Sequence, residues 1–321
     1  METTRRSFLG AVGAASTAAA MSRAAKTAGT QSKTKFYVAA ITPCDSRGKF
    51  DEALYRDLLP FLKERGADGV VVLGTTGEFP SFSFAERKKI AETALKHRAG
   101  LEIIVQVGTS NLPETLELLS HAAQNGADGT LCIPPFYFKN PPLQGLVKYY
   151  SQVLEASKIP VHLYHIPGTS AVPISLELLH ALEHYPNLAG IKDSTGNAEG
   201  YAAFVKEFPK LNMMTGTENN IPAALNAGMG GILMGGNLFT KQIAAIYAAH
   251  RQGKDLAEPV AKLRDATQLL RIPGAGGVPA IKYALGAMGL RESYVRPPYV
   301  DLTDEQKALL KPKVAQLAQL T

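Results

Sequence analysis

From Lys35 onward, short apolar runs alternate with longer stretches in which apolar residues recur at helical spacing. The first pair is typical: Phe36–Ile41 is almost wholly apolar, and Glu52–Arg65 has the spacing of an amphipathic helix. Asp51 before it and Gly66 after it are residues that favour helix starts and ends.

Further strands are predicted at Gly69–Leu73, Ile103–Val107, Gly129–Ile133, Val161–Tyr164, Leu188–Lys192, Asn212–Thr215 and Gly230–Met234. Further helices are predicted at Phe84–Arg98, Pro113–Asn125, Leu143–Ser157, Leu176–His184, Asn197–Phe208, Asn220–Ala227 and Lys241–Arg251.

Three joints between a helix and the next strand are alike and rich in glycine: 65–69, 125–129 and 227–231. Repeated turns of this kind suit repeated strand–helix units. Eight such units favour an α/β fold, a closed (β/α)8 TIM barrel, over an open sheet. We therefore predict a barrel over residues 31–254 and a C-terminal helical extension over 255–321. The extension contains three helical patterns, Leu256–Leu270, Pro279–Met288 and Asp304–Leu317.

Composition reduces the number of functional classes to which the chain can belong. With 45% hydrophobic and 19% charged residues, the chain of 321 residues has ample material for one large core. The formal net charge is +6, but no dense run of lysine and arginine with interleaved aromatics favours nucleic acid. Cys44 and Cys132 are far apart and read as buried free thiols. The scattered histidines do not favour a metal site.

Residues 1–30 read as a leader rather than part of the fold. Arg5-Arg6 is followed by Ser7-Phe8-Leu9, then by a short alanine-rich stretch and small residues up to Ala25. This order is typical of a twin-arginine signal peptide, and the apolar part is too short to span a membrane. We expect export to the periplasm. A disordered leader with a fortuitous arginine pair is the alternative.

Polar residues and glycines gather where the predicted strands end. In a (β/α)8 barrel, the carboxyl ends of the strands and the loops after them form the active site. One such loop, Gly74–Glu78, has two threonines and several backbone amides on a tight turn before a helix. It can bind a carboxylate or a phosphate, although it lacks the ending of a nucleotide phosphate loop. By itself it also fits a simple glycine turn capped by threonine.

Lys192 and Tyr164 are the two chemically suggestive strand-end residues. Lys192 closes the apolar run 188–191 and precedes a polar turn, so it is expected to face a cleft. A desolvated lysine becomes an amine nucleophile toward carbonyls. For each residue taken alone there is a structural alternative. Lys192 would extend to solvent from the strand end, and Tyr164 would be a core tyrosine whose hydroxyl is hydrogen-bonded inside the protein. Their common position at one rim favours imine chemistry on a small keto acid.

These motifs resemble those of the dihydrodipicolinate synthase / N-acetylneuraminate lyase family of pyruvate-dependent class I aldolases. The resemblance covers about Phe36 to Tyr299. It is carried by Gly74-Thr75-Thr76-Gly77-Glu78, Pro135-Phe136-Tyr137, Tyr164-His165-Ile166-Pro167 and Gly190-Ile191-Lys192-Asp193-Ser194-Thr195-Gly196. The spacing of 28 residues between the tyrosine and the lysine (192 − 164) also looks like that of the family.

The resemblance implies a role for each matching residue. Lys192 would form the imine, and Tyr164 would move protons at the substrate. Thr75 would link Tyr164 to Tyr137, which in this family reaches in from a neighbouring subunit. Thr75 and Thr76 would bind the substrate carboxylate, and the backbone of Gly216 and Leu233 would line the site. The family further implies a homotetramer.

Two departures from the family pattern bear on the substrate. The synthase has an arginine five residues after its catalytic tyrosine, where this chain has Thr169, and a hydroxyl cannot replace a bidentate guanidinium. His165 replaces a common asparagine. Together with export, Thr169 favours a hydroxylated 2-keto acid of the sialic acid or deoxy-keto sugar acid type. Thr169, Ser170 and Asn237 are candidates for binding its hydroxyls.

We therefore predict a lyase that forms a Schiff base and releases pyruvate, with no cofactor and no metal. Its partners would be small 2-keto acids rather than nucleic acid or membranes. Three alternatives remain open at this point: 4-hydroxy-tetrahydrodipicolinate synthase, a keto-deoxy-sugar-acid dehydratase, and a non-catalytic exported binding barrel.

Overall fold

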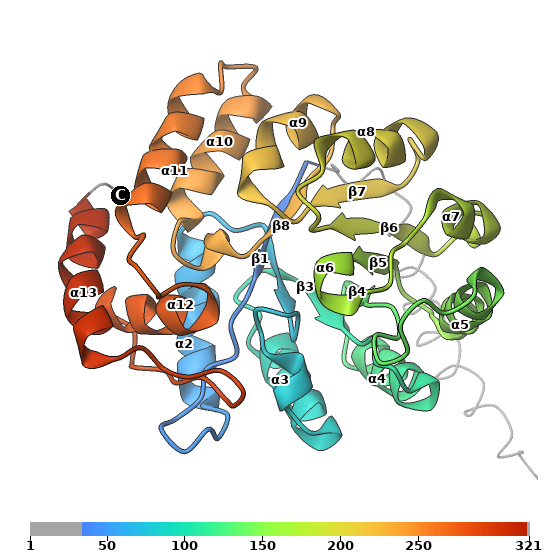
Figure 1. Ribbon diagram of the computed structural model, residues 1–321, viewed down its shortest axis with the longest axis horizontal. Coiled ribbons are helices and arrows are strands. Elements are labelled where there is room, and N and C mark those ends of the chain that lie inside the picture. The colour runs from blue at the N-terminus through green and yellow to red at the C-terminus, as the bar shows by residue number, and fades with distance from the viewer. Residues whose placement is uncertain (1–33, 320–321) are drawn as a thin grey trace, which may run out of the picture. The chain divides into compact units, whose positions relative to one another are not determined.

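The computed structural model describes residues 34–319, so the predicted leader, residues 1–30, lies outside the described residues. Eight parallel strands are each hydrogen-bonded to the next, and β8 closes onto β1 (Figure 1). The strands are β1 (Phe36–Ala39), β2 (Gly69–Val72), β3 (Glu102–Gln106), β4 (Gly129–Cys132), β5 (Val161–His165), β6 (Leu188–Asp193), β7 (Asn212–Thr215) and β8 (Gly231–Leu233). The predicted (β/α)8 barrel is confirmed.

Helices surround the barrel, as parallel strands joined by crossovers require (Figure 1). They are α2 (Glu52–Glu64), α3 (Phe84–Lys96), α4 (Leu112–Gln124), α5 (Leu143–Ala156), α7 (Leu176–Leu182), α8 (Ala198–Glu207), α9 (Ile221–Asn226) and α10 (Thr240–Arg251). Local sequence explains their starts: the side chains of Asp51 and Ser83 each accept a hydrogen bond from a first-turn amide. Gly66 ends α2 with φ +100°, a conformation that favours glycine.

The side chains of each strand alternate between the barrel interior and the helices. The ring of Phe36 packs on Tyr247 of α10, so Phe36 faces outward. Its neighbour Tyr37 therefore faces inward, where its hydroxyl donates to Glu102 at 2.6 Å. Register pairs Tyr164 of β5 with Lys192 of β6, which places these two side chains on the same face of the sheet.

The C-terminal extension consists of α11 (Ala257–Leu269), α12 (Gly277–Ala287) and α13 (Asp304–Gln319). These helices lie within one or two residues of their predicted limits. In Figure 1, α11 lies beside α10, and α13 lies beside α12. The extension also contributes a buried lysine, Lys282, whose side chain is fully enclosed.

Several short elements at the strand ends were not predicted, and two of them lie beside the predicted site residues. A helical turn, α6 (Pro167–Ser170), follows β5, and a 3-10 turn, Phe79–Ser81, follows the Gly74–Glu78 turn. Both are single turns, which leave too few residues for a periodic pattern in the sequence. Within residues 34–319, no helix has the length and apolar character needed to cross a membrane.

Candidate active site

Lys192 and Tyr164 meet at the carboxyl end of the barrel. The Nζ of Lys192 lies 4.5 Å from the centroid of the Tyr164 ring. Lys192 is 4% exposed and Tyr164 is 2% exposed. An amine and a phenol are thus held together with little surrounding water.

The environment of Tyr164 favours its ionised form. Burial raises the pKa of this phenol, but the charge of Lys192 and hydrogen bonds with Thr75, Ser194 and Lys192 lower it more. The net result is a pKa below the usual value of tyrosine. The Thr75 hydroxyl is 3.4 Å from the Tyr164 hydroxyl, so the predicted contact between these two residues is present. A phenol of this kind is suited to exchanging protons with a bound molecule.

The Gly74–Glu78 turn has a tightly determined backbone. The amide of Glu78 donates to the carbonyl of Thr75 at 3.0 Å and closes the turn. Leu73 and Glu78, at its two ends, have φ values of +59° and +54°, which non-glycine residues rarely adopt. A Cβ on Gly77 would lie 3.1 Å from the carbonyl oxygen of Ala40. Strained backbone of this type is often found where a loop binds a ligand.

The polar turn after β6 contributes a residue to which the sequence analysis assigned no role. The Ser194 side chain is one of the groups that lower the pKa of the Tyr164 phenol. Its amide donates to the carbonyl of His165 at 2.9 Å. Asp193 orders the same turn by accepting from the amide and the hydroxyl of Thr195, at 2.8 and 2.7 Å. Only the position of Ser194, two residues after Lys192, could have indicated its role from the sequence.

His165 supports the site from its outer side. It follows Tyr164 in β5, so its ring points to the opposite face, where it packs edge-on against Phe204. Its Nδ1 accepts the amide hydrogen of Ile174 at 2.9 Å. Burial lowers the pKa of this imidazole, although Asp193 acts in the opposite direction. The replacement of the family's asparagine therefore concerns packing behind the strand.

The three residues predicted to bind substrate hydroxyls differ in whether their polar groups are free to bind a substrate. Thr169 is exposed on α6. Ser170 is fully buried, and its hydroxyl donates to the carbonyls of Ile166 and Val172. Asn237 is also fully buried. Its amide accepts from Ile41 and donates to the carbonyls of Ala39 and Met234. The assignment of Ser170 and Asn237 to substrate hydroxyls was wrong, because internal hydrogen bonds already use these groups.

Tyr137, on the loop after β4, is largely exposed. Its side chain is 73% exposed and packs edge-on against Phe138, which is 72% exposed. Its amide donates to the hydroxyl of Ser110 at 2.9 Å. Beside it is a cavity of about 470 Å³ whose lining includes Phe79, Phe136 and Tyr137 itself. Within one subunit, the Thr75 hydroxyl meets Tyr164 and the Tyr137 ring points to solvent.

Gly216 and Leu233 are at the ends of β7 and β8. A Cβ on Gly216 would lie 2.0 Å from the hydroxyl oxygen of Ser194, so only glycine allows this approach. Leu233 is fully buried and pairs with Val38, on the outer face of the barrel. The role that the resemblance implies for the backbone groups of Gly216 and Leu233 stays a prediction.

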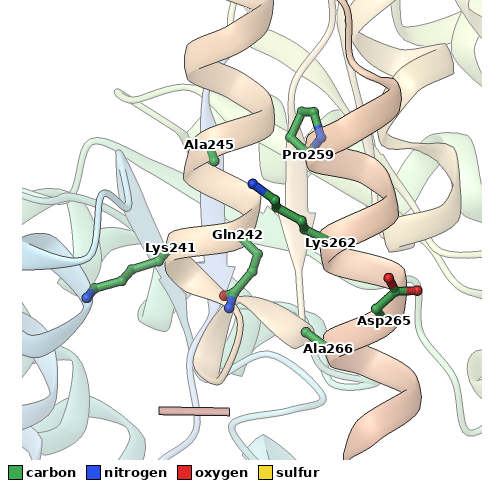
Figure 2. Close-up of a pocket in the computed structure, with 7 residues that line it drawn as sticks. All are labelled: Lys241, Gln242, Ala245, Pro259, Lys262, Asp265 and Ala266. Atoms are coloured by element: carbon green, nitrogen blue, oxygen red, sulfur yellow. The ribbon is translucent and has the colours of Figure 1, made fainter. Parts of the chain in front are cut away.

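A second groove lies between α10 and α11 and has a volume of about 350 Å³ (Figure 2). Lys262 reaches from α11 toward α10, whereas Lys241 and Asp265 point to opposite sides. This arrangement does not converge on a point where a substrate could react. Among residues 34–319, no group of three or more His, Cys, Asp and Glu side chains is placed to hold a metal ion.

Comparison with known proteins identifies the family. The model of the dihydrodipicolinate synthetase family matches residues 32–317. An uncharacterised DapA-like lyase of Chloroflexus aurantiacus is 35% identical over 85% of this chain and 93% of its own length. A 4-hydroxy-tetrahydrodipicolinate synthase of Bartonella bacilliformis is 32% identical over 85% and 94%.

Solved structures agree with this result. The prophage protein YagE of E. coli K12, determined in complex with pyruvate, is 28% identical with a TM-score of 0.82. The comparison covers 90% of this chain and 99% of YagE. The chain described here therefore belongs to the dihydrodipicolinate synthetase family.

Proposed function

We propose that this protein is a pyruvate-dependent lyase that forms a Schiff base and acts on a hydroxylated 2-keto acid. The observation that carries the proposal is the buried contact between the Lys192 amine and the Tyr164 ring. An amine that attacks a carbonyl needs a nearby group to move protons, and Tyr164 is that group. Two family members have been crystallised in complex with pyruvate, YagE and a synthase from Acinetobacter baumannii, which supports pyruvate as the shared reactant.

The proposed reaction begins with attack of the Lys192 nitrogen on the keto carbon and loss of that oxygen as water. The resulting protonated imine draws electrons from the bond between C3 and C4 of the substrate. This bond breaks as the C4 hydroxyl gives its proton to the relay that contains Tyr164, an aldehyde leaves, and the electron pair remains on C3 as an enamine. Proton transfer to C3, with Tyr164 in the relay, regenerates the imine. Water then releases pyruvate and the free amine of Lys192.

Thr75 and Thr76 are proposed to bind the substrate carboxylate on the Gly74–Glu78 turn. The turn begins directly after β2, beside the Tyr164 hydroxyl that Thr75 contacts. Thr169 is proposed to face the hydroxylated end of the substrate, because α6 directly follows the strand that carries Tyr164.

A second candidate is 4-hydroxy-tetrahydrodipicolinate synthase. The observation in its favour is the name borne by relatives that are 30–33% identical to this chain. The observation against it is the exposed residue Thr169. Its hydroxyl cannot form the bidentate ion pair with a second carboxylate that a guanidinium forms. Comparing turnover of pyruvate with aspartate semialdehyde against pyruvate release from sugar-derived keto acids distinguishes the two.

The decisive experiment is borohydride reduction in the presence of pyruvate, followed by mass analysis of peptides. We expect one covalent adduct, on Lys192. Lys192→Ala should abolish it, and Lys148→Ala, at an exposed position on α5, should leave it unchanged. The absence of an adduct in the unaltered protein would overturn the imine mechanism.

We also propose that the protein is exported by the twin-arginine route and acts in the periplasm. The support is the sequence of the leader, with Arg5-Arg6 ahead of Phe8-Leu9 and the alanine-rich stretch. Replacing Arg5 and Arg6 by lysine should retain the protein in the cytoplasm. Unchanged export of that variant in cell fractionation would reject this route.

A further inference from the structure

A buried ion pair connects the C-terminal extension to the substrate-binding turn. The Nζ of Lys282, on α12, lies 2.6 Å from Oε1 of Glu78, and both side chains are fully buried. Glu78 is the last residue of the turn that carries Thr75 and Thr76. Removing two charges from water is costly, and the pair does not necessarily add stability compared with apolar residues. Its presence next to the site therefore suggests a geometric role.

The remaining contacts of both groups also join the turn to the extension. Oε2 of Glu78 accepts the backbone amide hydrogen of Arg296 at 2.9 Å. Lys282 donates to the carbonyl of Tyr294 at 2.6 Å. Both carboxylate oxygens of Glu78 are thus held by the segment that follows the barrel. Glu78 also has the unusual positive φ described above, so its position is strongly constrained.

A second attachment fixes the exit of the same turn. The guanidinium of Arg296 pairs with Glu86 at 2.7 Å and donates to the carbonyl of Ser81 at 2.6 Å. It also lies over the ring of Phe82, at 4.3 Å from the centroid. The chain from Glu78 to Glu86 is therefore anchored twice to one segment of the extension.

From Glu78 the constraint continues to the reacting groups. The Glu78 amide holds the carbonyl of Thr75, and the Thr75 hydroxyl is 3.4 Å from that of Tyr164. A displaced Glu78 would move Thr75 relative to Tyr164. Shifts of about 1 Å in such groups can reduce rates by roughly 100-fold.

We propose that Glu78 and Lys282 are positioning residues, and that through them the C-terminal extension holds Thr75 and Thr76 in the geometry that binds the substrate carboxylate and orients Tyr164. This inference rests on the function proposed above for Thr75, Thr76 and Tyr164. It assigns to the extension a part in the active site, although the extension contributes no group to the reaction.

The test compares three variants: Glu78→Gln, Lys282→Met, and the double variant in which no buried charge is left unpaired. The control is Glu102→Gln, which removes a carboxylate held by Lys35 and Tyr37 at the opposite end of the barrel. For each protein, pyruvate affinity, deuterium exchange into the pyruvate methyl group, and melting temperature are measured. Hydrogen exchange of the peptide containing residues 74–82 reports the turn directly.

We expect the double variant to remain folded, with pyruvate affinity and methyl exchange each reduced about 10- to 100-fold. The peptide 74–82 should exchange faster, and Glu102→Gln should lose stability without these changes. The inference is overturned if the double variant lowers only the melting temperature, or if peptide 74–82 keeps its protection. Failure of the unaltered protein to form a pyruvate adduct would instead reject the proposed function, because the peptide measurement does not depend on pyruvate.

Discussion

Strand pairing determines the immediate surroundings of Lys192. Its partner across β5 and β6 is Tyr164, so two residues 28 positions apart in the sequence become direct neighbours. The phenol is placed against a cation and two hydroxyls, which lowers its pKa despite burial. The Tyr164 hydroxyl, rather than its ring, is therefore the group whose removal should affect proton transfer.

Tyr164→Phe should leave imine formation in place and slow the exchange of pyruvate methyl protons by about 10²- to 10⁴-fold. The measurements are borohydride trapping and methyl deuterium exchange by NMR. Tyr201→Phe is the matched control, since it removes another buried hydroxyl, which donates to Met213. Equal exchange rates in Tyr164→Phe and the unaltered protein would exclude the phenol from the relay.

His162 is expected to make stability depend on pH. It is buried inside the barrel, and burial lowers its pKa from 6.5 to about 4. Between these values the unfolded chain binds a proton that the folded protein does not, so stability decreases as the pH falls. The free energy of unfolding should decrease by about 2 kcal/mol from this residue between pH 7 and pH 5.

Melting temperatures at pH 7 and pH 5 test this expectation. The difference between them should shrink in His162→Leu, which replaces the imidazole by an apolar side chain of similar size. His184→Gln, at an exposed position, should leave the difference in place. An identical difference in His162→Leu and the unaltered protein would contradict a buried neutral imidazole.

At the level of elements, α6 determines which residues face the entrance after β5. This single helical turn leaves Thr169 exposed and buries Ser170 against its own backbone. The next residue, Ala171, has φ +56°, which ends the turn sharply. The proposed specificity for the part of the substrate beyond the keto acid therefore depends on Thr169.

Thr169→Arg should lower kcat/KM for a neutral, polyhydroxylated keto acid by about tenfold, because it introduces a charge that such a substrate cannot pair. Thr169→Gln, a polar residue without charge, should have a smaller effect. Steady-state kinetics with both variants provide the measurement. Unchanged kinetics in Thr169→Arg would show that residue 169 does not face the substrate.

At the level of the whole molecule, Tyr137 and Phe138 form an exposed aromatic pair, and Tyr137 lines a cavity that has both apolar and polar walls. Large aromatic side chains exposed together commonly mark an interface. This is consistent with the proposal that Tyr137 completes the site of a neighbouring subunit in a homotetramer.

Mixed oligomers can test this proposal. Lys192→Ala and Tyr137→Phe subunits should each have low activity. Reassembled together, they should regain part of it, because one mixed site contains both native residues. Light scattering should give the mass of four subunits. Lack of recovery despite proven subunit exchange would show that Tyr137 does not act across subunits.

Local sequence was sufficient to predict the elements of the barrel and to single out Lys192 and Tyr164, which the structure places side by side. Phe36–Ile41 and the other apolar runs are buried on both faces, so their composition alone marks them as strands of a parallel sheet. Lys192 was identifiable because a charged residue closes such a run. Boundaries differed by a few residues, since helix and strand ends depend on hydrogen bonds that hydrophobic pattern does not specify.

What the sequence by itself determined is therefore the barrel, its order of strands and the strand-end residues proposed to carry the chemistry. Only the tertiary structure decided which polar groups are free to bind a substrate and which already have partners within the protein. Ser170 and Asn237 are used by backbone partners, Ser194 lowers the pKa of Tyr164, and Lys282 meets Glu78 from 204 residues away (282 − 78). The reason is physical: hydrophobic periodicity records which face of an element is buried, whereas the partner of a polar atom depends on distances between segments far apart in the chain.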